Sequence, residues 1–190
     1  MAIKIAILGW GSLLWEYHAE YDAQHQEWLS DGPGLKLEFS RVSVSRKQAL
    51  TLVIDANNGV LCRVAYALSR REDPEDCICD LVLREGTKRN NIGFCFLDGS
   101  RQQSRDPGAL ETISSWARSK GIEVVVWTDL GSNFKSHSKC GQDFSVERAL
   151  AHIAALGVVG KVKAAEYVWL APEFVDTPLR KALQGLPWFL

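Results

Sequence analysis

Apolar residues follow the two-residue period of β-strands in several segments of the chain. Residues 3–8 are mostly apolar and lead into a glycine-containing turn, which predicts a buried strand followed by a tight loop. Residues 35–39 alternate between apolar and polar side chains, and residues 42–44 continue the alternation. Residues 49–54 and 60–68 flank a short polar segment that ends in glycine, which predicts that they pair as a hairpin. We therefore expect an antiparallel sheet in this part of the chain.

Capping residues indicate where helices begin and end. Asp73 can act as an N-cap, Pro74 suits the first helical position, and Gly86 suits the end of the helix that they begin. The same signals predict further helices, and apolar runs between them predict two more strands. These helices are expected at residues 106–121, at 145–157 and from 177 onward, and the strands at 91–97 and 122–127.

The order of strands, a hairpin and interspersed helices predicts an α+β fold. We expect a mixed, curled β-sheet or a small barrel with surrounding helices. The 190 residues contain no repeat and no linker, although residues 131–141 are polar enough to form a mobile loop. A chain of this length can bury a sizeable core, so a single domain over residues 1–190 is predicted.

Composition and charge restrict the class of partner. The 22 basic and 23 acidic residues are spread along the chain, which argues against nucleic acid and against an anionic membrane surface. No apolar run approaches the ~20 residues of a membrane span, and the N-terminus lacks the pattern of a secretion signal. Five scattered cysteines, an odd number, indicate reduced thiols, and Cys77 and Cys79 are expected on different faces of a helix. A cytoplasmic protein whose partner is a small molecule or a protein is therefore predicted.

The first strand leads into a loop that could bind an anion. Two glycines and a serine are concentrated there, in the order Gly9, Trp10, Gly11, Ser12 and Leu13. Because glycine lacks a Cβ atom, backbone N–H groups in such a loop can approach a carboxylate closely. A dinucleotide-binding loop would need a third glycine where Leu14 stands, and the Gly-Lys-Ser/Thr of a phosphate-binding loop is absent. A simple turn without a ligand is the remaining alternative.

Three short motifs in order resemble the γ-glutamylcyclotransferase-like superfamily. The sequence Trp10-Gly11-Ser12-Leu13 after a strand is similar to its aromatic-Gly-Ser-Leu signature. Residues 59–68 resemble its Gly-x-x-(Tyr)-x-Leu strand, and Leu83-Arg84-Glu85-Gly86 resembles the segment with its catalytic glutamate. The likeness covers roughly the first half of the chain. It departs from the family at Trp10, where tyrosine is usual, and at residues 87–91, which lack an aromatic residue.

The resemblance implies an enzyme that needs no cofactor. In the family the loop amides hold the substrate's α-carboxylate, so Gly9, Trp10, Gly11, Ser12 and Leu13 are the implied substrate-binding residues. Glu85 would take a proton from the α-amine, which then attacks the γ-carbonyl and releases 5-oxoproline and an amine. The substrate would be a γ-glutamyl or related amino acid derivative. Because Glu85 is expected at the C-terminal end of a helix, the helix dipole should raise its carboxyl pKa.

Three alternatives remain open. Glu85 could be a solvated carboxylate beside Gly86, in which case the chain would be a non-catalytic binding or interaction module of the same fold. A nucleotide-binding oxidoreductase is disfavoured by the missing third glycine. The chain could also form a homodimer through its apolar C-terminal tail.

Asn133 and the four histidines are further residues that could contribute to a site. Asn133 follows an apolar strand in a polar segment and is a candidate for an additional substrate contact, or alternatively for stabilising a turn. The four histidines show no paired ligand spacing, so no metal is expected.

Overall fold

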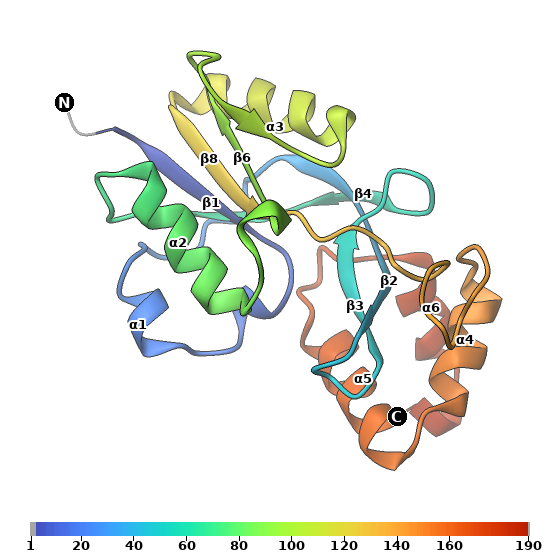
Figure 1. Ribbon diagram of the computed structural model, residues 1–190. Coiled ribbons are helices and arrows are strands. Elements are labelled where there is room, and N and C mark those ends of the chain that lie inside the picture. The colour runs from blue at the N-terminus through green and yellow to red at the C-terminus, as the bar shows by residue number, and fades with distance from the viewer. Residues whose placement is uncertain (1–2, 190) are drawn as a thin grey trace. The chain divides into compact units, whose positions relative to one another are not determined.

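The computed structural model describes residues 3–189 (Figure 1). The chain divides into two compact units, each built from two separate stretches of sequence. The first unit runs to Leu35 and resumes from Arg63 to Leu130, and the second comprises Lys36–Cys62 and the chain from Gly131 onward. The single domain expected from the sequence stays a prediction, because a division into compact units does not show whether each can fold alone.

The predicted α+β class is confirmed. The strands form one five-stranded sheet that contains both parallel and antiparallel pairs, and one three-stranded sheet. The expected barrel is not found, since the strands over residues 3–189 form two separate sheets and no closed barrel.

The first unit is organised around the five-stranded sheet. Its strand order is β5-β1-β8-β6-β7, in which β1 is parallel to β8 and antiparallel to β5. The strands are β1 (Ile5–Gly9), β5 (Ala65–Leu68), β6 (Ile92–Phe96), β7 (Gln102–Gln103) and β8 (Val124–Thr128). The helices are α1 (Ala19–Asp22), α2 (Pro74–Glu85) and α3 (Pro107–Lys120), with 3₁₀ turns at Ser12–Leu14 and Arg89–Asn91.

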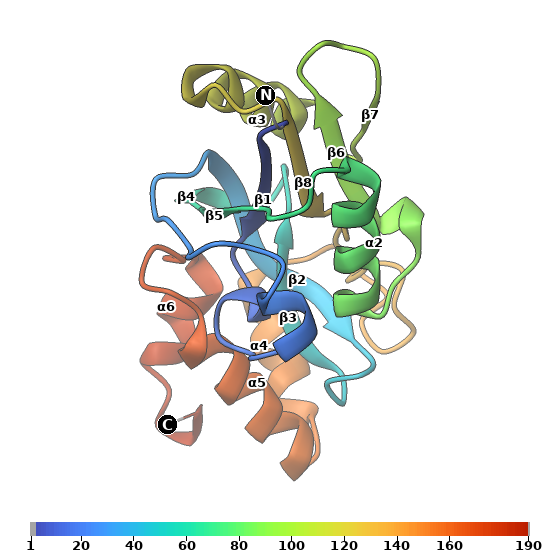
Figure 2. The ribbon, with the colours of Figure 1, turned by 90° about the vertical axis from the view of Figure 1, so that its left-hand side faces the viewer.

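The two long helices of the first unit cover different faces of its sheet. Figure 2 shows α2 and α3 on different sides of β8 and β6. On the α2 side, Ile78 and Leu81 pack in one buried cluster with Ile5, Ile7 and Val124. Successive side chains of a strand point to opposite faces of the sheet. The residues that alternate with Ile5, Ile7 and Val124 along β1 and β8 therefore face α3. The sheet is therefore buried on both faces, which explains the continuous apolar runs of β1 and β8.

Capping residues set the ends of α2 and α3 as predicted. The Asp73 side chain accepts a hydrogen bond from the Glu75 N–H at the start of α2, and Asp106 has the same role at the start of α3. Gly86 and Gly121 end the two helices in the left-handed conformation, with φ of 55° and 61°.

The second unit combines a small sheet with three helices. The sheet order is β3-β2-β4, with β2 (Gly34–Ser43), β3 (Ala49–Ile54) and β4 (Val60–Arg63). The helices are α4 (Val146–Ala155), α5 (Val158–Leu170) and α6 (Pro178–Gln184), and a 3₁₀ turn follows at Pro187–Phe189. Both α4 and α5 contact β3. Ser145 caps α4 and Thr177 caps α6, which confirms the starts predicted for these helices.

The predicted hairpin between residues 49–54 and 60–68 is wrong. β2 lies between β3 and β4, and β5 instead pairs with β1 in the first unit. The connecting loop passes close to β2: a Cβ atom on Gly59 would lie 2.8 Å from the main-chain nitrogen of Leu37. Asp55 Oδ1 accepts hydrogen bonds from the Asn57 and Asn58 N–H groups and folds the loop locally. The glycine that suggested a hairpin turn is required here by this close approach.

Helix α5 has no counterpart in the sequence prediction. Apolar residues occur on most of its sides, so it lacks the one-sided periodicity that identifies a surface helix. Gly157 was expected to end the preceding helix, but it also serves as the N-cap of α5. The short helix α1 was missed because four residues cannot display a helical period.

The five cysteines are free thiols, as expected. Cys77 is buried and Cys79 is exposed, which confirms that they fall on different faces of α2. No helix in the described part of the chain has the length and apolar character needed to cross a membrane.

Candidate functional site

The loop after β1 is held in a compact turn in the first unit. Gly9 ends β1, and a Cβ atom on it would lie 2.8 Å from the Trp28 ring, so only glycine fits at this point. The 3₁₀ turn Ser12–Leu14 follows, with the Leu14 N–H donating to the Gly11 carbonyl at 3.0 Å. The N–H groups of Ser12 and Leu13 come first in this turn, so they have no acceptor inside it. The turn itself therefore does not use these two main-chain donors.

Side chains of the loop differ in exposure. Trp10 and Leu13 are buried, and Leu13 belongs to the core cluster between α2 and the sheet. Gly11 and Ser12 are partly exposed. The loop is thus anchored by its two large apolar residues, and the glycine and serine between them remain accessible.

Arg84 connects this loop to the C-terminal turn of α2. Its Nη2 donates to the Ser12 carbonyl at 3.3 Å and to the Glu16 carbonyl at 3.1 Å. The Arg84 side chain is only 9% exposed, and the Glu16 carboxylate lies 3.8 Å from Nη2. A buried guanidinium bonded in this way fixes the position of the loop relative to the helix end.

Glu85, the predicted catalytic residue, is the last residue of α2. Its side chain is 19% exposed, and its Oε1 lies 4.0 Å from Arg84 Nη1. Gly86 follows it in the left-handed conformation, so the chain turns away directly after Glu85. The predicted loop and the predicted carboxylate therefore both adjoin the Arg84 side chain.

Tyr21 adds a polar group to this region. Its hydroxyl is buried and has no hydrogen-bond partner among residues 3–189. Burial raises the Tyr21 pKa well above its usual value, and the negative charge of Glu85 acts in the same direction. The hydroxyl is therefore protonated at neutral pH and can donate a hydrogen bond.

Asn133 lies in the second unit, where its side chain binds main chain. Its Oδ1 accepts from the Val42 N–H at 2.7 Å, and its Nδ2 donates to the Val42 carbonyl at 3.0 Å. Ser132 Oγ donates to the Ser40 carbonyl at 2.8 Å in the same way. Both polar atoms of Asn133 thus attach the loop to β2, and its role as a substrate contact stays a prediction.

Sequence reasoning did not assign the roles that Arg84 and Tyr21 have in the structure. A signal for Arg84 exists, because a cation in the last turn of a helix is placed to bind unpaired carbonyl groups. Nothing in the local pattern distinguishes Tyr21 from an ordinary core residue. In the described residues, no three or more Asp, Glu, His and Cys side chains form a group that could hold a metal ion.

Comparison with known protein families and with curated proteins finds no match to this chain. The resemblance to the γ-glutamylcyclotransferase-like superfamily therefore depends on the three short motifs themselves.

Proposed function

We propose that the chain is a γ-glutamylcyclotransferase-like enzyme with the curled-sheet fold of that superfamily. It would convert a γ-glutamyl amide or a related amino acid derivative to 5-oxoproline with release of an amine. The observation that carries this proposal is the side chain of Arg84, which bonds the Ser12 carbonyl and adjoins Glu85. Two motifs that lie far apart in sequence are thereby connected through one residue.

The chemistry requires a base next to a fixed substrate. The substrate's α-ammonium group is not a nucleophile until Glu85 removes a proton from it. The free amine nitrogen then bonds to the γ-carbonyl carbon, and the bond from that carbon to the leaving nitrogen breaks. Glu85 returns the proton to the leaving nitrogen, so one carboxylate serves both transfers. The second proton that the ring nitrogen loses passes to the released amine, which leaves as an ammonium ion. The product is a five-membered lactam and an amine.

The loop would hold the substrate's α-carboxylate, which is attached to the same carbon as the reacting amine. The N–H groups of Ser12 and Leu13, at the start of the 3₁₀ turn, suit an α-carboxylate. Holding the carboxylate restricts rotation and favours ring closure over other reactions of the amine. Arg84 acts here as a positioning residue, since its guanidinium is engaged by protein carbonyls and carboxylates.

The test is release of 5-oxoproline by purified protein from a panel of γ-glutamyl amides and dipeptides. Glu85→Gln keeps the shape of the side chain and removes the base, so turnover should fall by about 10²- to 10⁴-fold. Glu111→Gln on α3, an exposed position, is the matched control and should retain full turnover.

Trp10 favours one alternative, a binding module of the same fold without catalysis. An indole donates a hydrogen bond but cannot accept one as the family's tyrosine can. Absence of release from every substrate, together with measurable binding of 5-oxoproline by calorimetry, would support that module and reject the enzyme.

A further inference from the structure

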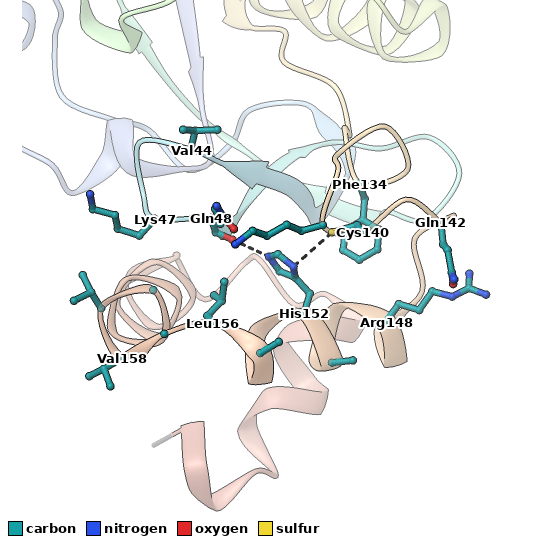
Figure 3. Close-up of a pocket in the computed structure, with 16 residues that line it drawn as sticks. Val44, Lys47, Gln48, Phe134, Cys140, Gln142, Arg148, His152, Leu156 and Val158 are labelled. Atoms are coloured by element: carbon teal, nitrogen blue, oxygen red, sulfur yellow. Dashed lines mark hydrogen bonds between the residues drawn. The ribbon is translucent and has the colours of Figure 1, made fainter.

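The second unit contains a cavity of about 1000 Å³ (Figure 3). It lies between the turn that connects β2 to β3, the loop around Cys140, helix α4 and the start of α5. This volume is at the upper end of what small-molecule sites usually have. The cavity shares no lining residue with the candidate site of the first unit.

The charged side chains that line the cavity are all basic. Lys47, Lys139 and Arg148 line it, and no aspartate or glutamate does. None of the three forms an ion pair with another described residue. Figure 3 shows Lys47 and Arg148 at opposite sides of the cavity, with His152 between them. The Asp143 carboxylate acts electrostatically on Arg148 but does not line the cavity, so the lining itself has a net positive charge, which attracts an anion.

His152 is a fixed, neutral part of the wall. Its Nε2 lies 2.8 Å from the Gln48 carbonyl, and its Nδ1 lies 3.5 Å from Cys140 Sγ (Figure 3). Because a carbonyl only accepts hydrogen bonds, Nε2 carries the proton and Nδ1 faces the thiol. Burial lowers the His152 pKa, with the positive charge of Lys139 acting in the same direction. Burial also raises the Cys140 pKa, so the pair is a thiol and a neutral imidazole, which suits binding better than catalysis.

The turn between β2 and β3 holds an uncommon conformation. Lys47 and Gln48 both have positive φ angles, 53° and 70°, although neither is glycine. The bond from His152 to the Gln48 carbonyl and the bond from the Gln48 N–H to the Ser43 carbonyl keep the turn in place. Strained residues of this kind cluster at ligand sites. The Gln48 Oε1 atom is buried without a hydrogen-bond partner among residues 3–189, so it can accept a bond from a ligand.

Apolar side chains complete the wall. Phe134 and Leu156 are buried, whereas Val44 and Val158 line the cavity while being 76% and 80% exposed. Exposed apolar residues next to a hollow indicate a ligand with an apolar body. We infer that the cavity binds an amphipathic organic anion, with its acid group near Lys139 and Arg148, an apolar body on Phe134 and Leu156, and an N–H or O–H donor toward Gln48. This inference does not depend on the proposed catalytic function.

Two fluorescent probes of the same shape test the charge requirement. Anilinonaphthalene sulfonate has an aromatic body, an N–H donor and a negative charge, and N-phenylnaphthylamine is its neutral counterpart. We expect the folded full-length chain to bind one molecule of the sulfonate and to bind the neutral probe more weakly. Equal affinity for both probes would overturn the inference, and so would absence of sulfonate binding.

Matched double variants locate the binding site. Lys139→Gln with Arg148→Gln should weaken sulfonate binding by about tenfold, given the usual strength of exposed charge pairs, and leave the neutral probe within about twofold. Lys163→Gln with Lys181→Gln removes the same charge from the same unit, away from the cavity, and should change neither affinity. An equal effect of the two double variants would show general electrostatic attraction and reject the site. Urea unfolding of each variant checks that all are folded.

Cys140 supplies an independent readout that needs no bound probe. A cysteine thiolate displaces iodide from iodoacetate, which is anionic, or from iodoacetamide, which is neutral, and the thiol proton passes to the buffer. The iodoacetate-to-iodoacetamide rate ratio, measured on peptides by mass spectrometry, should be higher at Cys140 than at Cys79 on the surface of α2. The ratio at Cys140 should fall in the Lys139→Gln, Arg148→Gln variant. A ratio at Cys140 no higher than that at Cys79 contradicts a cationic cavity.

Discussion

The candidate site of the first unit and the cavity of the second unit both contain arginine, but its surroundings differ. Arg84 is 9% exposed, donates to two carbonyls and has carboxylates at 3.8 and 4.0 Å. Arg148 is exposed, donates to the Asp143 carbonyl at 2.9 Å and forms no ion pair with another described residue. The buried guanidinium is held by carbonyls and carboxylates of the protein, although its Nε has no hydrogen-bond partner among residues 3–189. The exposed guanidinium has no carboxylate within ion-pair distance among the same residues. Burial and pairing, which residue type alone does not reveal, separate a structural cation from one that can meet a ligand.

Replacement of Arg84 is expected to cause the largest loss of unfolding free energy among the variants that test this comparison. Arg84→Met keeps the aliphatic part of the side chain but removes the charged donor from the Glu16 carbonyl and from the Ser12 carbonyl, which retains only main-chain donors. Because these are partly buried bonds to a charged group, the free energy of unfolding should fall by about 1.5–3 kcal/mol in urea titrations. If the proposed function holds, turnover should fall as well, since the loop loses its attachment to α2.

Arg89→Met is the matched control for this change. Arg89 is 44% exposed and pairs with Glu75, so its loss should cost about 0–1 kcal/mol. Similar losses in the two variants would contradict the assignment of Arg84 as a buried support of the loop.

Asn133 tests in the second unit whether a polar side chain supports the fold or contacts a ligand. The expected loss of unfolding free energy is intermediate in size. Asn133→Ala removes two hydrogen bonds to the Val42 main chain and should lower the free energy of unfolding by about 2 kcal/mol. Asn57→Ala, at an exposed loop position, should be nearly neutral. A stable Asn133→Ala protein with weakened substrate binding would instead support the substrate contact expected from the sequence.

The smallest expected effect is the contribution of His152 to the pH dependence of the free energy of unfolding. Its folded-state pKa is lowered, mainly by burial, so the unfolded chain takes up a proton before the folded chain does. The stabilising contribution is therefore complete above the ordinary histidine pKa of about 6.5 and is lost as the pH falls through that value. His152→Gln should reduce this dependence in urea unfolding measured over that range.

Comparison of wild type with the variant isolates this contribution. Burial raises the pKa of Glu38 and of Asp129, so their contributions change with pH in the opposite direction. They are present in both proteins and cancel in the difference. An unchanged pH dependence in His152→Gln would refute the assignment.

Most helix positions could be predicted from the sequence, because the signals act within a few residues. Asp73 and Gly86 bound α2, Asp106 and Gly121 bound α3, and Thr177 begins α6. Strand pairing could not be predicted in the same way. The order β3-β2-β4 depends on which strands meet after folding, and a two-residue period is the same for any partner.

For the candidate site, short motifs in order predict the loop at Gly11 and Ser12 and the carboxylate Glu85. The contact of Arg84 with the Ser12 carbonyl, 72 positions away in the chain, depends on the folded arrangement of the chain. The cavity likewise depends on the folded chain, because His152 bonds the Gln48 carbonyl, 104 positions away in the sequence. Local periodicity and caps describe neighbours along the chain, whereas these contacts arise from packing of distant segments.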